Sequence, residues 1–212
     1  LPPFTSLPED VRFICESMAC NQLIQVEPAY NDMRGAISHP GQDQAAQFTQ
    51  AFMEAYDIAA AHGRSLYYSG ARPDALTSRF CNAPYEALIV TPDDRIVACY
   101  EVVGAQHPLA ELSSMGRMQG ERLVMEPEKR AQLQSLLDAR RAACRACFAY
   151  WNCAGDCFTR AFLNGVERLG EESLRCQVNR TLTKYMLLSQ VEAGGGVWRR
   201  QAGVRQVVEE RC

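Results

Sequence analysis

Histidine, basic charge and long apolar runs are all scarce in this sequence. Its 212 residues include three histidines, and 22 lysines and arginines stand against 25 aspartates and glutamates, a net charge of −3. This balance argues against a nucleic-acid partner bound through a basic surface. No apolar run approaches the roughly 18 residues of a membrane span, and Leu1-Pro2-Pro3 does not start a signal peptide. We therefore expect neither nucleic acid nor a membrane among the partners.

Cysteine, in contrast, is abundant. The chain has ten cysteines, and 47% of its residues are hydrophobic, enough to build a core without disulfide bonds. Because the chain shows long helical patterns and no secretion signal, a metal site in a reducing, cytoplasmic compartment is favoured over a secreted disulfide scaffold. The alternatives are disulfides or buried free cysteines, and the second reading suits Cys15 and Cys20, which fall on a helical pattern.

Residues 1–75 alternate between helix and strand. Helical spacing of apolar residues predicts helices from Pro8 to about residue 18 and over 42–62, and short apolar runs predict strands at 23–27 and 65–68. Helices and strands in this order, joined by short connections, are typical of a parallel α/β fold.

The pattern changes near residue 76. Two β-rich runs, 86–91 and 95–103, predict a hairpin around Pro92-Asp93-Asp94, and helices are expected at 127–143 and 177–193. Residues 104–125 look like loop because of their glycines and proline, and 194–212 are expected to be a poorly ordered tail. The basic residues Arg140, Arg141 and Arg145 are expected at a solvated helix end.

Seven of the cysteines form a spaced pattern. Four fall within fourteen residues as C-x2-C-x5-C-x3-C, and three more flank them; the seven are Cys81, Cys99, Cys144, Cys147, Cys153, Cys157 and Cys176. Seven thiolates exceed one tetrahedral site and fit two sites of four and three ligands. Zinc would need an eighth ligand, and no histidine has a suitable spacing. Iron–sulfur clusters are commonly held by Cys thiolates alone and can leave one iron open, so they are favoured, with zinc as the alternative.

This spacing resembles the SPASM domain of radical S-adenosylmethionine (SAM) enzymes. All seven cysteines have counterparts in that family. Asp94 stands where the family has a glycine, but Asp is one of the few other residues that tolerate the left-handed backbone conformation. Residues 22–35 resemble a late strand and loop of the radical SAM barrel, and the similarity covers about residues 7–190. It implies an α/β chain in which 1–75 is the C-terminal portion of a partial TIM-type barrel and 76–193 a small α+β SPASM domain.

The resemblance also implies two auxiliary [4Fe–4S] clusters. The distal one would be ligated by Cys144, Cys147, Cys153 and Cys176. The proximal one would be held by Cys81, Cys99 and Cys157. Family members with a fully ligated proximal cluster have a further cysteine where this chain has Ala87. The fourth proximal position is therefore expected to be an open iron or an unidentified ligand.

The resemblance implies an enzyme, but this chain lacks the C-x3-C-x2-C motif that binds SAM and a third [4Fe–4S] cluster. We expect that segment before residue 1 and expect these 212 residues alone to be inactive. The intact enzyme would generate a 5′-deoxyadenosyl radical that abstracts hydrogen from a peptide or protein, with flavodoxin or ferredoxin as electron donor. Sulfatase-maturing members have Asp directly after the second cysteine, whereas Tyr100 and Glu101 follow Cys99 here, which makes this branch a weaker alternative.

Other functions and residues remain as hypotheses. The chain could be a zinc-stabilised binding module, or a cluster-bearing electron-transfer subunit whose partner carries C-x3-C-x2-C. Glu27, at a strand end, is a catalytic candidate that could equally pair with Arg34. Glu101 is a candidate base or a solvated carboxylate. Arg72 is a candidate contact to SAM or a surface linker residue.

Overall fold

The computed structural model describes residues 1–19, 22–29, 41–162 and 170–196. The chain has a mixed α/β fold with two small sheets, which confirms the fold class in its coarse form. It divides into two compact units. Of the described residues, the first unit contains 1–19, 22–29, 41–76 and 172–196, and the second contains 77–162 and 170–171.

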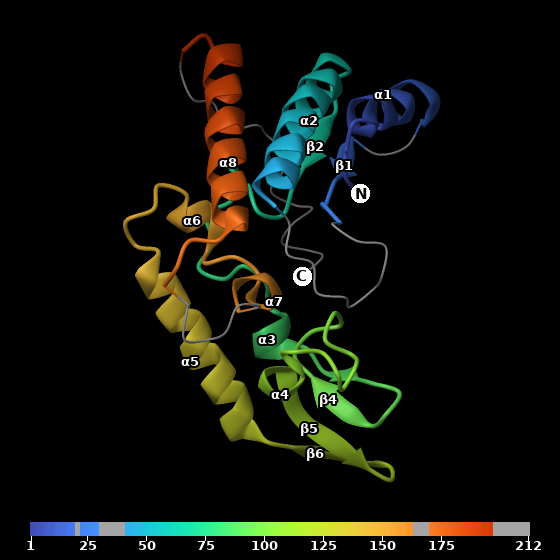
Figure 1. Cartoon of the computed structure of the whole chain (residues 1–212), viewed down its shortest axis with the longest axis vertical. Helices are drawn as coiled ribbons and strands as arrows, with labels where there is room; N and C mark the ends of the chain where they lie inside the picture. Colours follow the sequence, from blue (N-terminus) through green and yellow to red (C-terminus); the bar gives the residue numbers. More distant parts are fainter. Residues whose placement is uncertain (20–21, 30–40, 163–169, 197–212) are drawn as a thin grey trace. The chain divides into compact units, whose positions relative to one another are not determined.

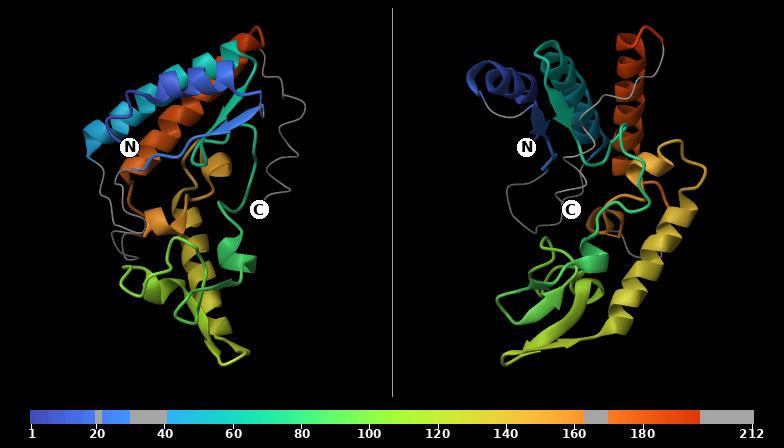
Figure 2. Two further views of the ribbon diagram at one scale, coloured as in Figure 1. Left: turned by 90° about the vertical axis from the view of Figure 1, so that its right-hand side faces the viewer. Right: turned by 180° about the vertical axis from the view of Figure 1, so that it is seen from behind.

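The first unit contains a parallel strand pair and three long helices. Its elements are α1 (Leu7–Ser17), β1 (Leu23–Gln25), α2 (Gln42–Ala61), β2 (Ser65–Tyr67) and α8 (Leu174–Ala193). Strands β1 and β2 are parallel, as expected from the alternating pattern, with Leu23 opposite Ser65. Helices α1 and α8 both pack against α2 (Figures 1 and 2). The two strands and the two helices that the sequence predicts before residue 76 are therefore confirmed.

Aromatic side chains form the centre of this unit. Tyr68 is fully buried, and its ring meets Phe48 and Phe52 edge to face, with centroids 5.6 and 5.9 Å away. Its hydroxyl donates a hydrogen bond to Asn179 Oδ1 at 2.9 Å, which ties α8 to the end of β2. Cys15 is a buried free thiol in this core, as the helical pattern suggested. Cys20 and Cys212 lie outside the described residues.

The second unit is built on a four-stranded antiparallel sheet in the order β3-β4-β5-β6. Its strands are β3 (Ile89–Val90), β4 (Arg95–Val97), β5 (Ser114–Gln119) and β6 (Arg122–Met125). Its helices are α3 (Ala83–Glu86), α4 (Ala110–Ser113), α5 (Pro127–Ala143), α6 (Tyr150–Cys153) and α7 (Phe158–Ala161). Helix α5 packs on the sheet through the fully buried Leu133.

The hairpin expected between residues 86 and 103 is confirmed. Strands β3 and β4 are antiparallel, and the Thr91 and Asp94 backbone N–H groups close the turn by donating to Arg95 O and Thr91 O. Asp94 has φ 63°, the left-handed conformation anticipated at this position. Asp94 thus adopts a conformation that is uncommon for residues other than glycine but that Asp tolerates.

The loop predicted for residues 104–125 is wrong. This stretch contains α4 and the β5–β6 hairpin, in which Gly116 pairs with Met125. Its glycines look like loop residues in the sequence, but Gly120 (φ 61°) forms the turn and Gly116 (φ 145°) lies within a strand. A side chain at Gly116 would place its Cβ 2.2 Å from Val124 O, so the close pairing of these strands requires glycine there.

The C-terminal end of the chain is described as far as residue 196. Helix α8 ends at Ala193 and is followed by Gly194–Gly196, and the rest of the predicted tail, 197–212, lies outside the described residues. Within the described ranges, no helix is both long enough and apolar enough to cross a membrane.

Candidate metal centre

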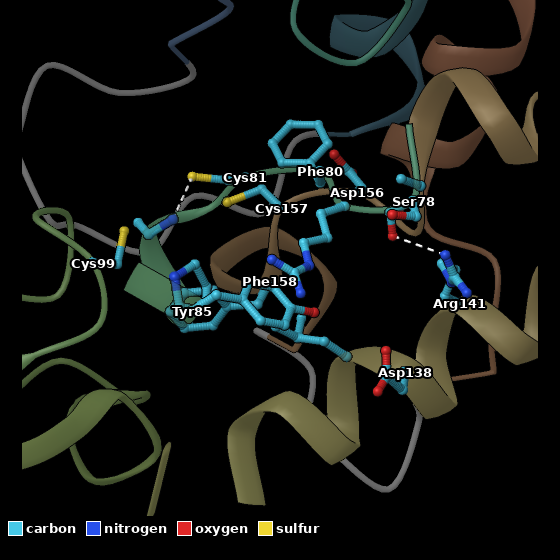
Figure 3. Close-up of a pocket in the computed structure, with 15 residues that line it drawn as sticks. Ser78, Phe80, Cys81, Tyr85, Cys99, Asp138, Arg141, Asp156, Cys157 and Phe158 are labelled. Carbon is cyan, nitrogen blue, oxygen red and sulfur yellow. Dashed lines mark hydrogen bonds between the residues drawn. The ribbon is translucent and has the colours of Figure 1, made fainter. Parts of the chain in front are cut away.

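Three of the predicted ligands line one pocket in the second unit. Cys81 directly precedes the α3 region, Cys99 follows β4, and Cys157 is the N-cap residue of α7. Their side chains lie together at one end of the pocket (Figure 3), which contains about 470 Å³ of space not filled by atoms, part of it open solvent. The fold therefore brings together residues that are 18 and 58 positions apart in the sequence, and these are the three assigned to the proximal cluster.

Each of these three sulfurs is contacted by the residue two positions later. Ala83 N donates to Cys81 Sγ at 3.4 Å. The backbone N–H of Glu101 donates to Cys99. Thr159 Oγ1 lies 3.0 Å from Cys157 Sγ. Hydrogen bonds to sulfur are among the interactions that orient thiolate ligands and set the potential of a bound cluster. Each of the three pocket cysteines therefore has a hydrogen-bond contact to its sulfur from a residue close by in the sequence.

Burial dominates the electrostatics of the pocket. It raises the pKa of the Cys99 thiol to about 12, and the nearby Cys157, Glu101 and Cys81 act in the same direction, against the hydrogen bond from the Glu101 backbone. In the metal-free protein Cys99 therefore keeps its proton at neutral pH. A metal bound there has to displace that proton, which makes binding dependent on pH.

The other cysteines of the dense motif lie along one irregular segment of the second unit. Cys144 caps the C-terminus of α5, the Cys147 N–H donates to Cys144 O at 2.9 Å, and Cys153 ends α6. Three consecutive residues between Cys153 and Cys157 have positive φ: Ala154 (51°), Gly155 (89°) and Asp156 (70°). Such conformations cost free energy in residues other than glycine and cluster at functional sites.

Arg140 supports this segment from within α5. It was expected at a solvated helix end, but only 3% of it is exposed, and this expectation is wrong. Its Nε donates to Gly155 O at 3.4 Å and its Nη1 donates to Glu171 O at 2.9 Å. Arg145, five residues later, is exposed as expected. Arg140 lies in the last turn of α5 and Arg145 just after its C-cap, so the sequence shows two arginines near the same helix end and does not distinguish them.

Cys176, the seventh predicted ligand, belongs to the first unit. It lies in the first turn of α8, where its N–H donates to Ser173 Oγ at 3.2 Å. The same hydroxyl lies 3.4 Å from Cys176 Sγ. Across the described ranges, no group of three or more His, Cys, Asp or Glu side chains is arranged to hold a metal ion. The donor chemistry of the Cys81, Cys99 and Cys157 pocket nevertheless suits a cluster, since clusters use thiolates alone.

The three weaker candidates have defined surroundings. Glu27 is exposed after β1, and its Oε1 accepts a hydrogen bond from Ser69 N at 2.9 Å, while Arg34 lies outside the described residues. Arg72 is buried, with 8% exposed, so the alternative of a surface linker arginine is wrong. Glu101 accepts hydrogen bonds from Thr159 Oγ1 (2.7 Å) and Arg160 Nη2 (2.9 Å) and is therefore not simply a solvated carboxylate.

Sequence reasoning missed Thr159 and Arg140 as parts of the centre. A hydroxyl two residues after a predicted ligand was the one available signal for Thr159, and no pattern marked Arg140. Comparison with protein-family models, curated proteins and solved structures gives no match to the chain.

Proposed function

We propose that this chain is the auxiliary-cluster part of a radical SAM enzyme of the SPASM type that modifies a peptide or protein. The observation that carries the proposal is the meeting of Cys81, Cys99 and Cys157 in one pocket. The spacing of the seven cysteines indicates a ligand role, and the family resemblance implies that these three share one cluster. Each of the three also has a hydrogen-bond partner two residues later in the sequence, which supports the proposal.

In this proposal the chain's own residues hold and surround two clusters. Cys81, Cys99 and Cys157 ligate the proximal one, and the distal one takes Cys144, Cys147, Cys153 and, by the family resemblance alone, Cys176. When bound, such clusters supply electron transfer and substrate binding. The radical step depends on SAM and a third cluster held by a C-x3-C-x2-C segment, which is not among these 212 residues. Electrons would come from flavodoxin or ferredoxin in a cytoplasmic, reducing setting.

The surroundings of Glu101 bear on the substrate class. Both of its carboxylate oxygens are engaged, one by Thr159 and the other by Arg160. Tyr100, which takes the position of the sulfatase-maturase Asp, cannot act as a carboxylate base. A natural-product peptide is therefore proposed ahead of a sulfatase as the substrate.

Anaerobic reconstitution with iron and sulfide tests the proposal. We expect about eight irons and eight sulfides per chain and broad absorption near 400 nm. The variants C81A, C99A and C157A should each lose about half of the iron. The matched control is C15A, which removes a buried thiol from the core of the first unit and should retain all of it.

Two outcomes would contradict the proposal. A colourless protein with about two zinc ions per chain would make the chain a zinc-stabilised binding module instead. Equal iron loss in C15A and C157A would show that iron content follows general stability rather than ligation.

A further inference from the structure

In the second unit, a chain of hydrogen bonds leads from Cys157 through Thr159 and Glu101 to Arg160. Thr159, with 2% of it exposed, lies between Cys157 and Glu101. Its Oγ1 is 3.0 Å from Cys157 Sγ and donates to Glu101 Oε2 at 2.7 Å. Arg160 Nη2 then donates to Glu101 Oε1 at 2.9 Å, forming an ion pair whose two side chains are each more than one third exposed. The buried member of the chain is thus the threonine hydroxyl.

The direction of these hydrogen bonds follows from proton counting. A hydroxyl has one proton and can accept through its lone pairs, whereas a carboxylate only accepts. Because Thr159 donates to Glu101, its contact with Cys157 requires the thiol to donate. A metal-bound sulfur is a thiolate and has no proton to give. The contact with a ligating Cys157 persists only if Thr159 turns its proton from the carboxylate to the sulfur.

We propose that Thr159 is a positioning residue of the metal centre, which exchanges Glu101 for the Cys157 sulfur as hydrogen-bond acceptor when Cys157 becomes a ligand. Arg160 then holds Glu101 in place, since its hydrogen bond goes to the other carboxylate oxygen. Among the three contacts to sulfur, this is the one made by a side chain; Cys81 and Cys99 receive theirs from the backbone. The inference rests on the proposed function, because it takes Cys157 as a ligand.

A titration of the full chain with Co²⁺ tests this assignment. We use an anaerobic background in which Cys144 and Cys147 are replaced by Ala, so that the pocket cysteines dominate the sulfur-to-cobalt absorption. In that background T159V, which keeps the shape but removes the hydroxyl, should weaken Co²⁺ binding by about tenfold or more. T159S should return the affinity to within about threefold of the parent. The control T183V makes the same change at a buried threonine of α8 in the first unit and should leave the Co²⁺ affinity unchanged.

A second readout separates positioning from mere structural support. In the iron-reconstituted protein, T159V should lower the reduction potential of one cluster, because a hydrogen bond to a thiolate stabilises the more negative reduced form. Equal Co²⁺ affinity in T159V and its parent, or equal losses in T159V and T159S, would overturn the role of Thr159 and leave the proposed function standing. A parent chain that binds neither Co²⁺ nor iron would overturn the proposed function and this inference together.

Discussion

Replacing Arg140 by Met should destabilise the cysteine-dense segment selectively. Methionine preserves the apolar stem of the side chain but removes the guanidinium contacts to Gly155 O and Glu171 O. Glu171 is exposed, so water can replace the lost partner of its carbonyl, at a cost of about 0.5–1.5 kcal/mol. Gly155 is buried, so water cannot readily replace the guanidinium as the partner of its carbonyl, and the loss costs about 1–3 kcal/mol. Together these give about 1.5–4.5 kcal/mol for R140M.

The position of Gly155 makes this loss specific to the centre. It is the middle one of three residues with positive φ that link Cys153 to Cys157. A backbone held in costly conformations depends on its surroundings to stay there. When the Arg140 contact is lost, the link should relax, and the iron content of the reconstituted protein should fall together with the stability.

Trp151 gives a local probe for this experiment. The chain has two tryptophans, and in a W198F background the fluorescence of Trp151 follows the second unit alone. Urea unfolding of R140M should show a free energy of unfolding lower by about 1.5–4.5 kcal/mol. R145M, the same change at an exposed arginine, should stay within about 0.5 kcal/mol of the parent. An R140M curve that coincides with that of R145M would refute the account of the buried guanidinium.

Three further predictions concern the two units and the pocket. G116A should destabilise the second unit by about 3 kcal/mol or more, because its Cβ would meet Val124 O at 2.2 Å; the Trp151 unfolding curve measures this. G70A should destabilise the first unit by about 2–4 kcal/mol, because its Cβ would meet Asn179 Oδ1 at 2.2 Å, and hydrogen exchange of α8 amides measures this. Each glycine variant is the control for the other, and a loss in the wrong unit would contradict the reasoning. Co²⁺ affinity should rise at least about tenfold per pH unit between pH 6.5 and 8.5. The reason is that burial raises the pKa of Cys99 to about 12, so the thiol proton must leave when the metal binds. An affinity that does not change with pH would contradict ligation by that thiol.

Much of the secondary structure could be predicted because local patterns determine it. Pro127 begins α5 and the helix runs to Ala143, as the spacing of Leu133 and its neighbours indicated. The parallel strands of the first unit and the β3–β4 hairpin also follow their sequence patterns. The β5–β6 hairpin could not be predicted in this way, because Gly116 and Gly120 allow many backbone conformations and glycines occur in loops as well as in tight strand pairs. Their role depends on the backbone that faces them, which no local pattern records.

The candidate site could be predicted as a set of residues but not as an arrangement. The spacing singled out seven cysteines, and only the family resemblance grouped Cys81, Cys99 and Cys157. Neither contained anything about Thr159, which looks like any other polar residue at a helix start. Arg140 was misplaced for a related reason. A long basic side chain can extend into solvent or fold back over its own helix end, and the choice depends on carbonyl groups elsewhere in the chain, here Gly155 O and Glu171 O.

The contacts two residues after each pocket cysteine have a common physical basis. A cysteine followed by a change of chain direction can turn its sulfur toward the donors of the next turn, and all three cysteines stand at such junctions: before α3, after β4 and at the start of α7. The backbone amides that serve Cys81 and Cys99 come with any sequence that makes these turns. At Cys157 the contact comes from a side chain, so a single substitution can remove it. In the proposed metal centre, the Thr159 contact is therefore the one contact among these three that a change of side chain can remove.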